Sequence, residues 1–109
     1  MAEAFAIQES CEDRRRTLTL TGELDVASAP QLEQRVMELC REAAVEIVLD
    51  MGRLAFIDSS GLNAILRLKA VCEERGCEFY LAPGPPPVER LFDITRLTDR
   101  LPFRKASRD

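Results

Sequence analysis

The side chains best suited to chemistry lie in the segment Asp58-Ser59-Ser60-Gly61. It joins the apolar stretch 54–57 to an apolar stripe of helical spacing, which predicts a helix N-terminus with Ser59 or Ser60 as the N-cap. Free amide groups and the helix dipole at such an end attract anions. Either the segment is only a capping sequence, or one serine accepts a phosphate of about −1.5 to −2 charge while the helix stays folded. The residues alone leave both interpretations open.

Other kinds of chemistry are restricted by composition. The 109 residues contain no histidine, which excludes serine–histidine and histidine–metal sites. The cysteines Cys11, Cys40, Cys72 and Cys77 form no CxxC pair, so we expect free, buried or half-buried thiols and no metal site. A glycine-rich phosphate loop is also missing, and no cofactor is predicted. The sequence therefore favours a binding module over an enzyme.

The charge balance and the N-terminal residues limit the partners. Fifteen Lys and Arg face 19 Asp and Glu, which gives a net charge of −4 and argues against a general nucleic-acid binder. Residues 1–9 contain neither a basic start nor an apolar run. No segment approaches the ~18 apolar residues of a membrane helix. We therefore expect a cytoplasmic protein that does not insert into a membrane.

Strand patterns occur in four places. Alternating or apolar residues predict strands at 5–9, 17–21, 45–50 and 77–82. Gly22 is expected to end the second strand, and residues 101–103 form a candidate edge strand. The segment 45–50 is nearly all apolar, which is typical of a central strand covered on both faces.

Three helices are expected between and after these strands. Ser28 with Gln31 and Pro30 predicts the start of the first helix. Its apolar face comprises Leu32, Val36, Leu39, Cys40 and Ala43. A second stripe spans 62–72 and ends at Gly76, a C′ glycine, and a short third helix follows the prolines 85–87.

This order of elements predicts the fold class. Two strand–helix–strand units indicate right-handed crossovers in a single α/β domain, with a mixed sheet of four or five strands and three to four helices. The domain is expected to span 1–109, with its core at 5–103 and a frayed tail at 104–109. The two long helices could share one face of the sheet or take one face each.

Four segments carry a family resemblance. They are Gly22-Glu23-Leu24-Asp25, then 47–50 (IVLD), 56–62 (FIDSSGL) and 88–92 (VERLF). Their order resembles that of STAS domains, and over residues 5–103 the chain is similar to the bacterial anti-sigma factor antagonists, which are stand-alone STAS proteins. Relatives often end with a further amphipathic helix, which this sequence is expected to lack.

The resemblance implies a function and the residues that serve it. Such proteins bind an anti-sigma factor, usually an ATP-dependent serine kinase, and so release a sigma factor. The kinase would phosphorylate Ser59, directly after Asp58, to end binding, and a phosphatase would restore it. Ser60 is expected to be structural and is the second candidate for phosphate. Asp25 and Gly61 complete the expected partner-binding surface of a monomer or weak homodimer, although Asp25 could simply be a turn residue before a helix.

Two rival functions are weighed against this one. A phosphate-accepting enzyme would use Asp25, Asp50 and Asp58, but it needs a late lysine near a metal, and Lys105 lies in the expected tail. A STAS subunit of another assembly, such as a lipid-transport ABC complex or a stressosome-like scaffold, would dock without phosphorylation of Ser59. The intact segment 58–61 favours regulation but leaves the docking module open, because capping alone could retain a serine.

Overall fold

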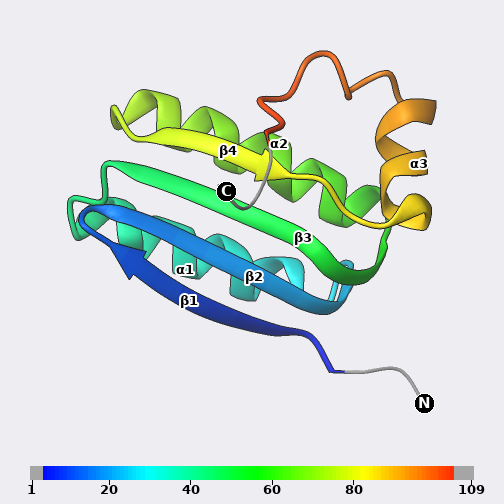
Figure 1. Ribbon diagram of the computed structural model, residues 1–109, viewed down its shortest axis with the longest axis horizontal. Coiled ribbons are helices and arrows are strands. Elements are labelled where there is room, and N and C mark those ends of the chain that lie inside the picture. Colours follow the sequence, from blue (N-terminus) through cyan, green and yellow to red (C-terminus); the bar gives the residue numbers. More distant parts are fainter. Residues whose placement is uncertain (1–3, 105–109) are drawn as a thin grey trace.

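Four strands and three helices alternate along residues 4–104, the part of the chain described by this computed structural model (Figure 1). The strands are β1 (Ala6–Glu12), β2 (Arg15–Leu24), β3 (Glu46–Ile57) and β4 (Glu78–Ala82). The helices are α1 (Ala29–Arg41), α2 (Ser59–Glu74) and α3 (Pro86–Ile94). This is the α/β element order that the sequence predicted.

The sheet is mixed, with the strand order β1-β2-β3-β4. β1 pairs antiparallel with β2, while β2, β3 and β4 are parallel neighbours. The connections through α1 and α2 step in the same direction across the sheet, and right-handed connections of this kind place both helices on one face. Figure 1 shows α1 and α2 behind the same side of the sheet. The topology thus decides a question that helix periodicity left open.

The hydrophobic core lies between this face and the two helices. The prediction that 45–50 contains a central strand covered on both faces is confirmed for residues 47–49, which are buried on both sides, although α1 and α2 lie on the same side. Val48, 4% exposed, does not belong to the main core cluster. It pairs with Thr17 on β2 and Tyr80 on β4, both half-buried, in the middle of the other face. The apolar run therefore reflects a central position in the sheet rather than a second helical layer.

Gly22 does not end the second strand, contrary to the prediction. β2 continues to Leu24, with register shifts on both sides of Gly22, whose φ is +84°. A Cβ at Gly22 would lie 2.8 Å from the backbone of Phe5. Glycine here permits an irregularity within the strand. The register places the extra residues in β3, where Met51 and Gly52 lie opposite Leu20 and Ala55 lies between the partners of Gly22 and Glu23. β2 reaches Leu24, beside the start of α2.

The C-terminal segment is anchored as far as Arg104. The predicted edge strand at 101–103 is reduced to one isolated parallel bridge between Leu81 and Phe103, since Pro102 has no N–H to donate to a ladder. Arg104, the first residue of the expected tail, donates its N–H to Leu81 O, and its Cζ lies 3.7 Å from the ring centroid of Tyr80. The remainder, 105–109, lies outside the described residues.

The first helix ends earlier than its apolar pattern suggests. α1 stops at Arg41, and Ala43, predicted on its buried face, is exposed with φ +65°. The N–H of Ala43 donates to Cys40 O (3.3 Å) and the N–H of Ala44 to Leu39 O (3.1 Å). These two bonds form a Schellman motif with alanine at the C′ position that glycine usually takes. Ala43 thus terminates the helix.

Replacing Ala43 by glycine is expected to raise the free energy of unfolding by about 0.5–1 kcal/mol. The left-handed conformation costs an L-residue about 1–2 kcal/mol, partly offset by the greater chain entropy of glycine in the unfolded state. Urea unfolding of Ala43→Gly measures the change. Ala70→Gly, at an exposed position inside α2, is the matched control and should lose about 1 kcal/mol. Equal losses in both variants would contradict the strain assigned to Ala43.

Candidate functional site

The segment 58–61 lies at the edge of the sheet where β2 and β3 end and where α1 and α2 begin (Figure 1). The two strands are parallel, so the loops that follow them meet at one edge. The N–H of Asp58 donates to Leu24 O at 3.2 Å and ties the start of α2 to the end of β2. The site is therefore built on two strand ends and two helix starts.

Asp58 is the N-cap of α2. Its backbone is extended (φ −113°, ψ −174°), and its Oδ1 accepts the N–H of Gly61 at 3.0 Å. Its carbonyl accepts the N–H of Leu62 at 3.0 Å, the first bond of the helix. The prediction that Ser59 or Ser60 caps the helix is wrong, because both already lie in the first turn. The short Asp58 carboxylate reaches the third helical amide without their help.

The two serines differ in their exposure. Ser59 is exposed at the first helical position, while Ser60 is half-buried at the second. Within residues 4–104 neither hydroxyl has a hydrogen-bond partner, and neither backbone N–H has an acceptor. The first turn of α2 thus presents one accessible hydroxyl close to two free amide donors.

Gly61 lies beneath this surface. It is buried, and a Cβ there would lie 2.5 Å from Leu24 O and 2.9 Å from Leu24 Cγ. Without a side chain, α2 can approach the end of β2 closely enough for the bond between Asp58 and Leu24. Gly61 therefore positions the exposed residues of the segment.

Asp25 organises the loop between β2 and α1. Its Oδ1 accepts the N–H groups of Ala27 (3.0 Å) and Ser28 (3.1 Å). Ser28 occupies the N-cap position of α1, but its hydroxyl donates to Glu23 O (2.7 Å) and accepts the N–H of Asp25 (3.0 Å). The predicted capping box with Gln31 therefore does not form. The Ser28 hydroxyl is already engaged by the loop, in which Asp25 makes an Asx-type turn.

Two separate hollows flank the loop. One, of about 230 Å³, lies between α1 and α2 and is lined by Val26, Ala29, Pro30, Glu33, Ser60, Asn63 and Arg67. Arg67 Nε lies 2.7 Å from Glu33 Oε2, an ion pair that joins the two helices and raises the pKa of Arg67. The other, of about 340 Å³, is lined by Asp25 together with Phe5, Glu23, Ala27, Ser28 and Gln31. Asp25 and Ser60 thus line different hollows.

Two exposed apolar side chains near the segment were not identified from the sequence. Val26 is 72% exposed next to Asp25, and Phe56 is 47% exposed two residues before Asp58. Exposed apolar side chains among polar groups are typical of protein-binding surfaces. Loop and strand periodicity give no signal for them, because apolar residues in a strand are expected to face the core.

Asp58→Ala is expected to lower the free energy of unfolding by about 1 kcal/mol, since it removes the acceptor of the Gly61 amide. Urea unfolding measures this loss. Asp58→Asn is the matched control, because asparagine caps a helix about as well while carrying no charge. If Asn loses as much stability as Ala, the charge of Asp58, rather than its capping bond, stabilises α2.

The comparisons with known sequences agree on one family. The family model for the STAS domain matches residues 6–109. The anti-sigma F factor antagonist of Paenibacillus polymyxa is 34% identical over 85 residues, which cover 77% of this chain and 73% of that protein. The anti-sigma-B factor antagonist of Staphylococcus aureus (strain NCTC 8325 / PS 47) is 26% identical over 93 residues, covering 85% and 86%. In residues 4–104 no helix is long and apolar enough to cross a membrane.

Solved structures share the fold. An anti-sigma factor antagonist from Mycobacterium paratuberculosis aligns with a TM-score of 0.82 at 20% identity, over 95% of this chain and 87% of that one. The unphosphorylated form of the anti-sigma factor antagonist SpoIIAA aligns with a TM-score of 0.79 at 25% identity, over 94% and 89%. Its phosphorylated form aligns with a TM-score of 0.71 at 23% identity, over 95% and 92%. With a mixed four-stranded sheet, three helices and a family model that matches from residue 6 onward, the chain belongs to the STAS domain family.

Proposed function

We propose that this protein is a cytoplasmic, non-enzymatic anti-sigma factor antagonist. It binds an anti-sigma factor that is a serine kinase, and this binding frees a sigma factor. The names of its relatives from Paenibacillus polymyxa and Staphylococcus aureus support the proposal. The edge of the sheet around Asp58 offers a surface for such a partner, with the exposed Val26 and Phe56 beside it.

Phosphorylation of Ser59 switches this binding off in the proposed mechanism. The observation that carries the proposal is the exposed Ser59 hydroxyl at the first position of α2, which has no hydrogen-bond partner within the described residues. A kinase can reach such a hydroxyl without unfolding the helix. Ser60, half-buried in the hollow between α1 and α2, is the less accessible second candidate.

The physical effect of a phosphate at Ser59 is local. It adds about −1.5 to −2 charge, which the free amides of Ser59 and Ser60 and the helix dipole accommodate. The same charge lies beside Asp58 and repels acidic groups of a partner. The fold therefore persists while the binding surface changes, and a phosphatase restores the original surface.

The other residues of the proposed surface have distinct parts. Asp25 holds the loop that carries Val26, through its bonds to Ala27 and Ser28. Asp58 holds Ser59 at the start of the helix. Gly61 acts from below the surface by permitting the close approach of α2 to β2.

Affinity purification from the native organism followed by mass spectrometry tests this function. The tagged wild-type chain is the bait, and the tryptic peptide 54–67, which carries both serines, is checked for phosphate. We expect a kinase-like anti-sigma factor as the partner and phosphate on Ser59. A membrane permease or a scaffold as the partner, with an unmodified peptide, would instead assign the protein to another STAS assembly.

A further inference from the structure

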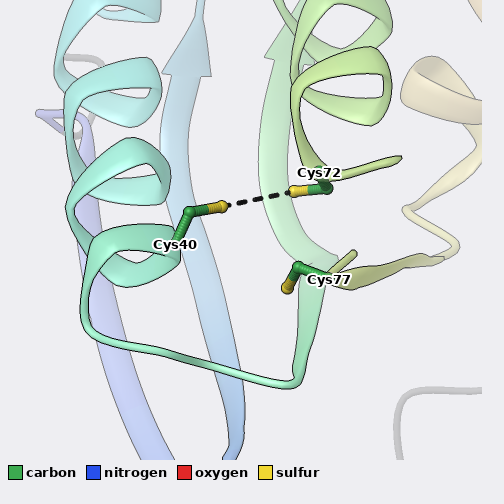
Figure 2. A group of neighbouring side chains, drawn as sticks. All are labelled: Cys40, Cys72 and Cys77. Atoms are coloured by element: carbon green, nitrogen blue, oxygen red, sulfur yellow. Dashed lines mark hydrogen bonds between the residues drawn. The ribbon is translucent and has the colours of Figure 1, made fainter. Parts of the chain in front are cut away.

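Three of the four cysteines meet at the edge of the sheet opposite to Ser59 (Figures 1 and 2). Cys40 comes from the end of α1, Cys72 from the last turns of α2, and Cys77 from the residue before β4. Their sulfur atoms all lie within 4.8 Å of one another, and Cys40 Sγ is 3.9 Å from Cys72 Sγ. Cys11 lies on β1 and is exposed, contrary to the expectation that every thiol is buried or half-buried.

Helix termination fixes the backbone under the cluster. The N–H of Cys77 donates to Cys72 O (2.9 Å) and the N–H of Gly76 donates to Glu73 O (3.3 Å). With Gly76 at φ +74°, these bonds form a Schellman motif that fixes the backbone of Cys77 relative to that of Cys72. Cys40 is held in the equivalent way, since its carbonyl accepts the N–H of Ala43 (3.3 Å). Sites on such rigid elements need little rearrangement to bind a ligand.

The sulfur separations are those expected around a shared metal ion. In a trigonal site with metal–sulfur bonds of about 2.3 Å, the sulfur atoms lie about 4.0 Å apart. Cys40 and Cys72 already have nearly this separation.

The three cysteines of the cluster differ in how far they are buried. Cys72 is fully buried, Cys77 is 5% exposed, and the half-buried Cys40 leaves one side open for entry. Burial raises the pKa of Cys77 to about 11 and also raises that of Cys72. Glu46, whose charge acts on Cys77, is paired with Arg15 and Arg104.

We propose that Cys40, Cys72 and Cys77 form a three-thiolate site for a single Cu(I) ion. Thiolates select soft metal ions, and the chain has no histidine. Among residues 4–104 the group of metal-ligating side chains contains these three sulfur atoms and no fourth ligand. Three ligands complete the shell of Cu(I), whereas Zn²⁺ takes four. On binding, three thiol protons pass to solvent, three copper–sulfur bonds form, and no oxidation state changes.

Competition with a chromogenic Cu(I) chelator tests the site, using the reduced full chain under anaerobic conditions. We expect one Cu(I) per chain for the wild type, with a thiolate-to-copper charge-transfer band and a raised melting temperature. Cys40→Ala and Cys72→Ala should each weaken binding by at least about 100-fold. Cys11→Ser, the matched control on β1, should bind as the wild type does.

Several results of these measurements would overturn the proposed site or the choice of Cu(I). Binding that survives in Cys40→Ala, or that is lost in Cys11→Ser, would overturn the site, as would failure of the wild type to compete with the chelator. Tighter binding of Zn²⁺ than of Cu(I) would overturn the choice of ion. If Cys72→Ala does not fold, the half-buried Cys40→Ala decides alone, after its circular dichroism spectrum has shown a folded chain. None of these measurements depends on Ser59 or on the anti-sigma partner.

Discussion

Ser59→Asp is expected to weaken binding of the purified anti-sigma partner by more than about 100-fold. A carboxylate at the first position of α2 places a second negative charge next to Asp58 on the proposed binding surface. A penalty of about 3 kcal/mol corresponds to this loss, at roughly 1.4 kcal/mol per tenfold change in affinity. Titration calorimetry with the partner measures the change.

The stability of the same variant should barely change. An acidic group in the first turn of a helix is favourable by about 0.3–1 kcal/mol, so the melting temperature should stay equal or rise by up to about 4 °C. Loss of binding together with a large fall in melting temperature would indicate unfolding rather than a switch.

Three control variants separate charge, hydroxyl and position. Ser59→Asn resembles aspartate in shape without its charge and should keep affinity within a few-fold. Ser59→Ala cannot be phosphorylated and should bind permanently, whereas weak binding by this variant would reveal a contact made by the hydroxyl itself. Ala70→Asp adds the same charge on an exposed position of α2, eleven residues away. If it weakens binding as much as Ser59→Asp, a general charge effect replaces the proposed local switch.

Gly61→Ala is expected to lower the free energy of unfolding by about 2 kcal/mol or more. The added Cβ would meet Leu24 O at 2.5 Å and Leu24 Cγ at 2.9 Å. A backbone oxygen in a strand cannot rotate away as a side chain can, so α2 must shift from the end of β2. The melting temperature should fall by roughly 10 °C, and affinity for the partner should also fall because Asp58 and Ser59 move with the helix.

Gly52→Ala is the matched control for this substitution. A Cβ at Gly52, an exposed position on β3, would meet only Asp50 Oδ1, at 3.1 Å. This carboxylate can turn aside at the cost of its exposed hydrogen bond from the Gly52 N–H (2.9 Å), so stability should fall by no more than about 1 kcal/mol. Comparable losses at both positions would contradict the contact with Leu24 as the cause, since neither glycine has a positive φ.

Local patterns predicted most of the secondary structure and one part of the site. Helix α2 ends where Gly76 predicts, because a glycine at C′ relieves strain within a few residues. The start of α2 also falls within the motif at 58–61, as predicted from capping residues that precede an apolar stripe of helical spacing. Errors arose where a local signal competes with a tertiary one: Gly22 lies inside β2, which continues to pair with β3, and Ala43 lies beyond the end of α1.

The capping predictions failed for a related reason. Aspartate, serine and asparagine are comparable N-caps, so composition does not distinguish Asp58 from Ser59. The bond from the Asp58 N–H to Leu24 O holds Asp58 extended and starts the helix at Ser59. The Ser28 hydroxyl likewise donates to Glu23 O instead of capping α1, because Asp25 holds the loop in this conformation. Contacts with a neighbouring strand or loop are not encoded in the capping residues themselves.

By itself, the sequence determined the α/β class, the order of the elements and the candidate serine, because periodicity, glycine positions and a contiguous motif are local properties. Only the tertiary structure decided that α1 and α2 share one face of the sheet, since this depends on the order of the strands. It also decided that three cysteines without a CxxC pair meet within 4.8 Å. Their elements are brought together because α1 packs against α2 and α2 packs against β4, and no spacing along the chain records that proximity.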